Sequence, residues 1–201
     1  MRARNEPRLR FVSHNVHGIQ KDIKEEKILC HMRQTPTDGY LAIETWDGEV
    51  GTFENEGFTI IKHAAFKKNS GTASRLSGGF TFFLPEHTAK AWVRAGCVLV
   101  DDIGPRVCGI KLLFTDEKGK DVTIFWGAAY APTSDATTEE QDEYFDQLQT
   151  LIDRTSATDV LMLSGDFNAS LGIRTDHRDK VLGKFGIEHR NRAGDRLHDF
   201  L

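Results

Sequence analysis

The 201-residue chain has little cysteine and no long apolar segment. Cys30, Cys97 and Cys108 form no C-x-x-C pair, so neither a zinc site nor a disulfide framework is indicated, and a reducing compartment is expected. Cys97 and Cys108 are expected as small buried apolar groups, although they could also face each other on neighbouring strands. No stretch approaches the roughly 18 apolar residues of a membrane span, and the N-terminus lacks the apolar region of a secretory signal. We therefore expect an intracellular protein of the nucleus or cytoplasm, not secreted and without a membrane partner.

An excess of positive charge is also missing. The chain holds 26 basic and 30 acidic residues, and its formal net charge of −4 gives no overall attraction to nucleic acid. Residues 135–146 contain six carboxylates and no Lys or Arg, whereas the C-terminal part is basic. Both runs can be ordinary solvated surface. The sharper hypothesis assigns phosphate-backbone contacts to the basic residues Arg174, Arg178, Lys180, Lys184, Arg190, Arg192 and Arg196.

Strands and helices alternate along the chain, without a repeat or a low-complexity linker. Its length and 39% hydrophobic content are sufficient for one buried core. The patterns predict helices over 21–33 and 138–154, and strands over 9–14, 41–44, 58–62, 80–84, 91–100, 107–114 and 122–128. Residues 116–119 predict a hairpin turn that pairs the last two strands antiparallel. The apolar run 160–163 is too short for a helix and predicts a strand buried on both faces.

Four short strings place polar residues where a predicted strand runs into a loop. They are S-H-N-V-H-G at 13–18, A-I-E-T-W at 42–46, A-A-Y-A-P-T at 128–133 and S-G-D-F-N at 164–168, and they supply Asn15, Glu44, Tyr130, Asp166 and Asn168. Because ligands collect at strand ends in mixed α/β sheets, we expect one shared cleft. An acid buried at a strand end needs a partner, and Mg²⁺ takes one or two carboxylates plus water and phosphate oxygens. The set therefore suits a metal-dependent phosphodiesterase.

Each of these residues also has a purely structural explanation. Asn15 can be a loop residue and Glu44 a turn cap, Tyr130 can pack in the core, and Asp166 and Asn168 can form a turn. The structural explanations would all have to hold together for four motifs in this order. The combination therefore favours the functional interpretation. His14 and His17 flank Asn15 and could approach the cleft, but strand alternation places His14 on the opposite face.

The order of the strings resembles the endonuclease/exonuclease/phosphatase family, which has the deoxyribonuclease I-like fold and includes apurinic endonucleases, sphingomyelinases and inositol polyphosphate phosphatases. V-L-G-K-F-G at 181–186 and N-R-A-G-D-R-L-H-D-F-L at 191–201 look most like the endonuclease domain of non-long-terminal-repeat retrotransposons and craniofacial-development-protein-2-like proteins. The resemblance covers residues 10–201 and leaves 1–9 as an N-terminal extension. It implies an α+β fold, a four-layer α/β sandwich of two packed mixed β-sheets flanked by helices.

The resemblance also implies roles for the residues. Glu44 would bind Mg²⁺, with Mn²⁺ as an alternative, and Asn15 would hold a metal-bound water or a phosphate oxygen beside it. Asp166 would orient and help deprotonate the attacking water, Asn168 would hold the scissile phosphate, and Tyr130 would bond a non-bridging oxygen. The expected activity is endonucleolytic hydrolysis of DNA.

The family continues with an Asp-containing strand and a Ser-Asp-His motif, and neither occurs before Leu201. The resemblance therefore implies the front part of a domain truncated at its C-terminal end, with impaired activity, whose longer parent would hold the missing segment or a reverse transcriptase domain. Thr175-Asp176-His177 imitates the motif, but it lies where the family has a loop, so His177 is not assigned the catalytic role. Two other functions stay open: a non-catalytic remnant or binding module, and a phosphoinositide or sphingomyelin phosphodiesterase.

Overall fold

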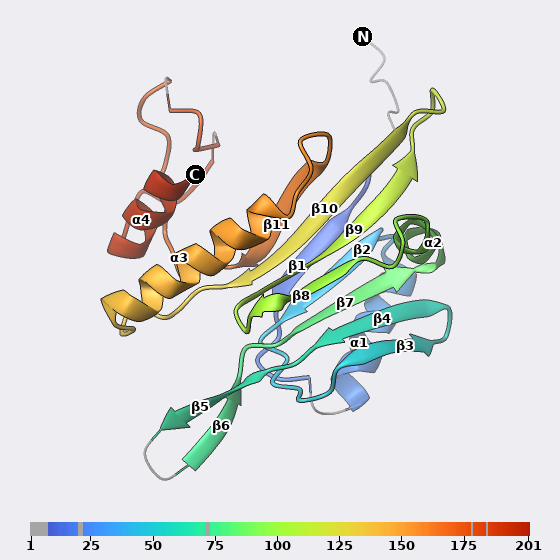
Figure 1. The fold of residues 1–201 in the computed structure, drawn as a ribbon, viewed down its shortest axis with the longest axis horizontal. Helices are drawn as coiled ribbons and strands as arrows, with labels where there is room; N and C mark the ends of the chain where they lie inside the picture. Colours follow the sequence, from blue (N-terminus) through green and yellow to red (C-terminus); the bar gives the residue numbers. More distant parts are fainter. Residues whose placement is uncertain (1–7, 20–21, 71–72, 178, 184) are drawn as a thin grey trace.

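Two β-sheets pack face to face in the computed structural model, which describes residues 8–19, 22–70, 73–177, 179–183 and 185–201 (Figure 1). The first sheet has the order β1 (Phe11–Asn15), β2 (Gly39–Ile43), β7 (Phe80–Pro85), β4 (Phe58–His63), β3 (Gly51–Asn55). The second has the order β11 (Val160–Asp166), β10 (Asp121–Tyr130), β9 (Val107–Thr115), β8 (Leu99–Gly104). A hairpin of β5 (Phe66–Ser70) and β6 (Ala73–Ser77) projects from the body.

The core lies between the sheets because their strands alternate apolar side chains toward each other. Leu41, Ile43 and Phe82 of the first sheet meet Ile110 and Trp126 of the second. The Trp126 ring centroid lies 4.8 Å from that of Phe11 and 5.1 Å from that of Phe82, both edge to face. These contacts hold the two sheets in one fixed arrangement.

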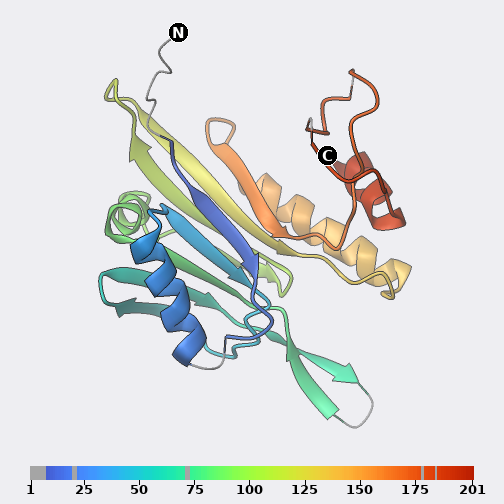
Figure 2. The same ribbon diagram turned by 180° about the vertical axis from the view of Figure 1, so that it is seen from behind.

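Helices cover the outer faces of both sheets. Helix α1 (Asp22–Gln34) packs Ile28 and Leu29 on the first sheet, and helix α3 (Thr138–Asp153) packs Leu148 and Leu151 on the second. Thr137 and Glu140 start α3 with reciprocal side-chain to backbone hydrogen bonds. The layers are therefore helix, sheet, sheet and helix, which confirms the expected α+β sandwich (Figure 2). Among the described residues, no helix has the length and apolar character needed to cross a bilayer.

Parallel pairing places the site residues at one edge of each sheet. Strand β1 runs parallel to β2, with Asn15 beside Ile43, and β10 runs parallel to β11, with Tyr130 beside Asp166. The predicted antiparallel pairing of β9 with β10 is confirmed, and Gly119 takes the positive φ of 77° that their turn requires.

Three expectations from the sequence are wrong. The predicted strand 91–100 is helix α2 (Glu86–Arg94) followed by β8, because residues after Pro85 bury Thr88, Ala91 and Trp92 at helical spacing. The run 160–163 is not buried on both faces, since β11 is an edge strand with exposed residues at its start. All three cysteines are free thiols, but Cys97 is exposed and only Cys108 is buried.

The last described segment is helix α4 (Arg192–Phe200), which the sequence patterns did not predict. Asn191 accepts a hydrogen bond from Gly194 N and so caps the helix start. A Cβ atom at Gly194 would lie 2.0 Å from the carbonyl oxygen of Ser170. Only glycine permits this close approach, which holds α4 against the chain that leaves β11.

Candidate active site

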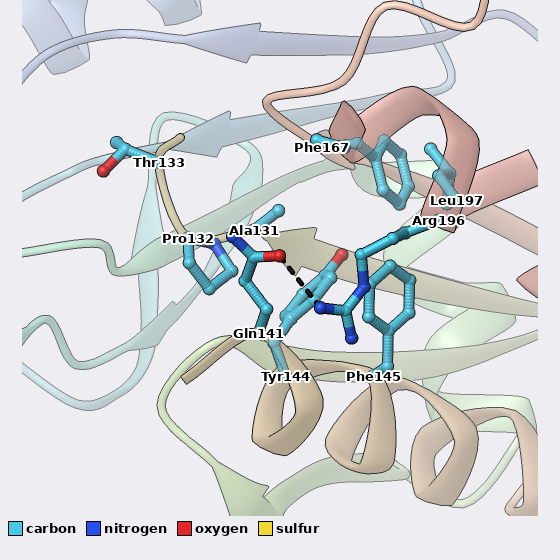
Figure 3. A pocket seen from close by; sticks show the side chains of 10 residues that line it. Ala131, Pro132, Thr133, Gln141, Tyr144, Phe145, Phe167, Arg196 and Leu197 are labelled. Atoms are coloured by element: carbon cyan, nitrogen blue, oxygen red, sulfur yellow. Dashed lines mark hydrogen bonds between the residues drawn. The ribbon is translucent and has the colours of Figure 1, made fainter. Parts of the chain in front are cut away.

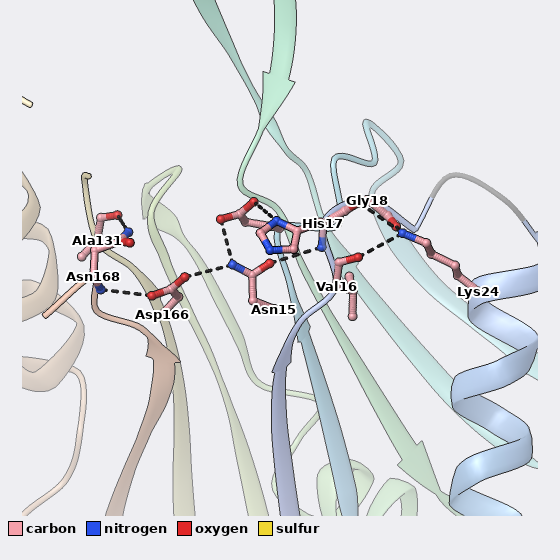
Figure 4. A network of polar contacts seen from close by, with 9 residues as sticks. Asn15, Val16, His17, Gly18, Lys24, Ala131, Asp166 and Asn168 are labelled. Atoms are coloured by element: carbon pink, nitrogen blue, oxygen red, sulfur yellow. Dashed lines mark hydrogen bonds and ion pairs between the residues drawn. The ribbon is translucent and has the colours of Figure 1, made fainter. Parts of the chain in front are cut away.

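One side-chain amide joins the two sheets at the predicted cleft. Asn15 Nδ2 donates to Glu44 Oε1 and to Asp166 Oδ2, each at 2.9 Å (Figure 4). Asn15 ends β1 and Glu44 follows β2 in the first sheet, whereas Asp166 ends β11 of the second. This one amide therefore joins three of the five predicted residues, and the other two contact Asp166 and Glu44 as described below.

The two carboxylates are close together and poorly compensated. Because both accept from the same nitrogen, Glu44 and Asp166 lie side by side, and Glu44 is only 9% exposed. Within the described residues, neither forms an ion pair with a lysine or arginine; His17 Nδ1 lies 3.2 Å from Glu44 Oε2. Asp166 is half-buried, and two carboxylates shielded from water in this way repel unless a positive charge lies between them. This electrostatic arrangement fits one divalent cation.

Glu44 and Asp166 are the groups that would hold such a cation, whereas Asn15 turns its amide nitrogen toward both carboxylates and its oxygen accepts from His17 N at 3.2 Å. No cluster of three or more His, Cys, Asp or Glu residues of the kind that encloses a metal occurs among the described residues. Carboxylate and amide oxygens suit Mg²⁺, which usually keeps several waters and binds substrate phosphate oxygens. The two carboxylates therefore form an open ligand set, with room for waters and a substrate oxygen.

The loops around the site hold an unusual concentration of backbone strain. His17, Glu44, Trp46 and Asn168 have φ values of 46°, 56°, 52° and 46°, in the left-handed region that disfavours residues other than glycine. Lys24 Nζ stabilises one of these loops by donating to the carbonyl oxygens of residues 16, 17 and 18 at 3.1, 3.2 and 2.7 Å (Figure 4). Backbone strain of this kind persists where surrounding contacts hold the chain in the strained conformation, and such positions cluster at functional sites.

Asn168 holds Asp166 from the other side. Its backbone N–H donates to Asp166 Oδ1 at 3.0 Å, and its side-chain amide donates to the carbonyl oxygen of Ala131 at 2.8 Å. Both carboxylate oxygens of Asp166 therefore accept a hydrogen bond, one from Asn168 and one from Asn15. The carboxylate is oriented before any substrate arrives, which is the property required of a group that positions a water.

Tyr130 presents a hydroxyl to Glu44. Burial, together with the adjacent Glu44 carboxylate, raises the pKa of Tyr130 to about 12. The raised pKa keeps the phenol protonated at neutral pH, so it can donate a hydrogen bond to an anion.

Arg106, in the turn between β8 and β9, is a site residue that sequence reasoning missed. Its guanidinium lies 5.0 Å from the Phe66 ring centroid and 5.6 Å from that of Tyr130, and its Nη1 donates to the Tyr130 carbonyl oxygen at 3.3 Å. Burial lowers the pKa of Arg106, and within the described residues no carboxylate forms an ion pair with it. A stacked cation of this type suits an anionic substrate. A lone arginine in a G-P-R-V turn left no signal that sequence reasoning could have used.

The predicted basic residues have different environments. Lys180 and Arg192 are exposed, whereas Arg190 Nε donates to the Leu171 carbonyl oxygen at 2.8 Å. Arg174 is partly buried, and its Nε has no hydrogen-bond partner among the described groups. Arg178 and Lys184, together with residues 1–7 of the expected N-terminal extension, lie outside the described residues.

Arg196 points into the small cavity between α3 and α4 rather than outward. It donates to Gln141 Oε1 at 3.0 Å, pairs with Asp142, and lies 5.3 Å from the Phe145 ring centroid (Figure 3). These contacts give Arg196 a structural role in holding α4.

The other histidines considered from the sequence are also accounted for. His177 is 89% exposed and lies against Asp176, so it does not enter the cleft. His14 faces away from Asn15, with Nδ1 2.6 Å from the Tyr40 hydroxyl, as strand alternation predicts. His17 is the histidine that reaches the site.

Sequence comparison relates the chain to two curated proteins. It is 32% identical over 105 residues to craniofacial development protein 2 of Bos taurus, which is 52% of this chain and 16% of that protein. It is 35% identical over 83 residues to craniofacial development protein 2 of Tragulus javanicus, 41% of this chain and 14% of that protein. The matched part is thus a small fraction of each relative. No protein-family model matches the chain.

Solved structures show the same architecture. An AP endonuclease, LMAP, from Leishmania major is 14% identical with a TM-score of 0.58, over 95% of this chain and 64% of that one. The catalytic domain of APE2 from Xenopus laevis is 16% identical with a TM-score of 0.55, over 94% and 67%. The 3′ phosphatase NExo from Neisseria, bound to a product DNA hairpin, is 14% identical with a TM-score of 0.52, over 82% and 60%.

The fold is the one expected from the resemblance to endonuclease/exonuclease/phosphatase proteins, and it is shared by these AP endonucleases and the 3′ phosphatase. By sequence, the chain is similar to craniofacial development protein 2. The resemblance inferred from four short motifs is therefore confirmed.

Exchanging Asn15 for aspartate is expected to destabilise the protein in a way that a cation reverses. Asn15→Asp removes the donor shared by Glu44 and Asp166 and adds a third carboxylate, so the free energy of unfolding in EDTA should fall by about 1–3 kcal/mol. Thermal unfolding with EDTA and with Mg²⁺ measures this, and Asn55→Asp on the exposed edge strand β3 is the matched control. Equal stabilisation of Asn15→Asp and wild type by Mg²⁺ would show that no cation binds between these groups.

Proposed function

We propose that this protein is a Mg²⁺-dependent phosphodiesterase that cleaves DNA, as an endonuclease domain of the retrotransposon type. The observation that supports this best is the pairing of Glu44 with Asp166 through Asn15, at the edge where the two sheets meet. Tyr130 and Arg106 add a phenolic donor and a cation at the same place. The site thus combines groups for a divalent cation with groups for a phosphate.

Each of these residues has a separate role in the proposed reaction. Asp166, fixed by Asn15 and Asn168, orients the attacking water and accepts its proton. Tyr130 donates to a non-bridging phosphate oxygen as negative charge builds there, and Arg106, stacked on the Tyr130 ring, balances that charge. Glu44 and Asp166 would hold Mg²⁺ or Mn²⁺, which would supply electrostatic stabilisation of the phosphate and of the leaving oxygen. Asn168 would turn from Ala131 to hold the scissile phosphate.

The choice of DNA rests on the comparisons and the motifs. The structural neighbours include AP endonucleases and a 3′ phosphatase bound to a DNA hairpin. The retrotransposon type follows from the 181–201 stretch and the similarity to craniofacial development protein 2. Residues 10–201 would then be part of an endonuclease/exonuclease/phosphatase domain, inside a longer parent protein that also holds a C-terminal segment or a reverse transcriptase domain. The free thiols support a site of action inside the cell, in the nucleus or cytoplasm.

Metal binding and DNA cleavage should both depend on Glu44. We expect weak Mg²⁺ or Mn²⁺ binding by calorimetry and metal-dependent nicking of supercoiled plasmid, both lost in Glu44→Gln, because that change removes a carboxylate without altering the size of the side chain. Glu117→Gln, in the exposed β9–β10 turn, is the matched control. The nicking should also stop in EDTA.

Three results would count against the proposal. The first is equal metal binding by Glu44→Gln and wild type, which would remove Glu44 from the site. The second is nicking that persists in EDTA. The third is hydrolysis of sphingomyelin or a phosphoinositide in place of DNA, which would keep the chemistry and change the substrate.

A further inference from the structure

Between β11 and α4, the described residues 172–177, 179–183 and 185–191, called the 172–191 loop below, expose large apolar side chains. Phe185 is 95% exposed and Ile187 is 63% exposed. Leaving a phenylalanine in water forgoes about 1.5–3 kcal/mol of burial. Neither side chain has a role in the catalytic site described above.

The 172–191 loop is a built structure that holds Phe185 outward. Leu182 is buried beneath it, and Asp179 Oδ1 accepts hydrogen bonds from the backbone of Val181 at 2.9 Å and of Leu182 at 3.2 Å. A Cβ atom at Gly186 would lie 2.5 Å from the Gly172 carbonyl oxygen, so the chain after Phe185 packs closely on the start of the loop. The inward Leu182 and the glycine contact leave Phe185 on the outer side.

Both ends of the loop are tied to the chain that follows the site. Asn191 N donates to the Ser170 carbonyl oxygen at 3.1 Å, and Ser170 N donates to Asn191 Oδ1 at 3.0 Å. Ser170 is two residues beyond Asn168. His198 Nε2 of α4 lies 3.1 Å from Asp179 Oδ2, which fixes the middle of the loop to the helix. The loop therefore rises beside α4 from the end of β11 that holds Asp166 (Figures 1 and 2).

The charge of this segment differs from that of the whole chain. Residues 172–192 contain six Lys or Arg and three Asp or Glu, although the chain as a whole has a net charge of −4. Lys180 and Arg192 expose their side chains on this segment. An exposed aromatic ring in a basic segment that follows the Asp166 strand in sequence matches a nucleic-acid strand, whose bases stack on aromatic rings and whose phosphates pair with cations.

We infer that Phe185, with Ile187 beside it, stacks on an unpaired base of the DNA strand whose phosphodiester occupies the Asp166 site. This inference rests on the proposed function and specifies its substrate, which is DNA with a locally unstacked nucleotide. Apolar side chains that insert at such positions hold a distorted strand in place while cations neutralise the flanking phosphates. Phe185 is a specificity-determining residue in this arrangement and makes no contact with the reacting atoms.

Binding of hairpin oligonucleotides to the full chain in EDTA tests the inference apart from hydrolysis. One hairpin holds a single unpaired base and its partner is fully paired. Phe185→Ala should weaken binding to the unpaired-base hairpin by roughly 5- to 150-fold, the value of one stacked base, and should remove the preference over the paired hairpin. Val93→Ala, an exposed apolar residue on α2, should leave both affinities unchanged.

Phe185→Trp provides a direct readout. It should retain the preference for the unpaired base, and its added fluorescence over wild type should be quenched when that hairpin binds. Four results would each overturn the inference. Two concern the variants: unchanged hairpin affinity in Phe185→Ala, and no fluorescence quenching in Phe185→Trp. The other two are the absence of hairpin binding, and Phe185-dependent binding to anionic vesicles in place of DNA. Plasmid nicking with Phe185-independent binding would overturn this inference alone, whereas Phe185-dependent binding without nicking would overturn only the proposed function.

Discussion

Asp166→Asn is expected to lower plasmid nicking by about 10²- to 10⁴-fold, the range that a lost general base typically costs. The amide keeps the size of the carboxylate, and its one oxygen can still accept from either Asn15 Nδ2 or Asn168 N, one of the two donors that orient the carboxylate. It cannot accept a proton from water. The chemistry should therefore be lost while the local packing is retained.

The same change should leave the stability of the protein in EDTA close to that of wild type. The loss of one hydrogen bond to Asp166 costs about 0.5–1.5 kcal/mol, and removing one of two adjacent carboxylates relieves their repulsion and offsets this cost, so the melting temperature should stay nearly constant while activity falls. Nicking rates and thermal unfolding on the same preparations measure both effects. Asp199→Asn, on the exposed side of α4, is the control for charge. A melting temperature that falls together with the rate would assign Asp166 a structural role.

Tyr130→Phe is expected to lower nicking by about 10²- to 10³-fold, the typical cost of removing one donor to a developing negative charge. The ring stays in place between Arg106 and the core, so the change isolates the hydroxyl. Because the pKa of Tyr130 is raised to about 12, the phenol is a donor throughout the neutral range, and its ionisation should not shape the pH profile of the wild-type enzyme near neutrality.

Tyr144→Phe is the matched control for this change. The Tyr144 hydroxyl is buried and has no hydrogen-bond partner among the described residues, so its removal should leave activity and stability close to wild type. Rates measured over a pH series for both variants separate the two hydroxyls. Equal losses in Tyr130→Phe and Tyr144→Phe would point to disturbed packing of the sandwich instead of a lost donor.

The site shows how many functional residues can be predicted from their position at the end of a strand. Asn15, Glu44 and Asp166 were recognised because each follows a short apolar run, and the parallel registers of β1 with β2 and of β10 with β11 place such residues at one edge. The four sequence motifs did not indicate that the two sheets are in contact. This contact arises because the faces containing Phe82 and Trp126 pack together, which brings Asn15 within 2.9 Å of Asp166 across 151 positions of sequence.

The errors have equally specific causes. Residues 91–100 contain valine and tryptophan, which suit a strand, but Trp92 is buried most effectively on a helix that starts after Pro85. Val160 and Leu161 form an apolar run, but their exposure depends on whether another strand lies beside β11, which no local pattern reports. Arg106 sits in a turn far from every motif and meets Tyr130 only through strand pairing.

By itself, the sequence determined most strand and helix positions and pointed to five polar residues at strand ends, because apolar periodicity and strand-end motifs are local properties. The α+β class was implied by the resemblance of those motifs to a known family. Tertiary structure alone decided which of these residues touch, and that Arg106 and His17 join them while His177 and Arg196 do not. The physical reason is that distances between side chains depend on the packing of two sheets and on β pairings between remote segments. The free energy that sets those pairings is spread over the whole core and is not encoded in any short string.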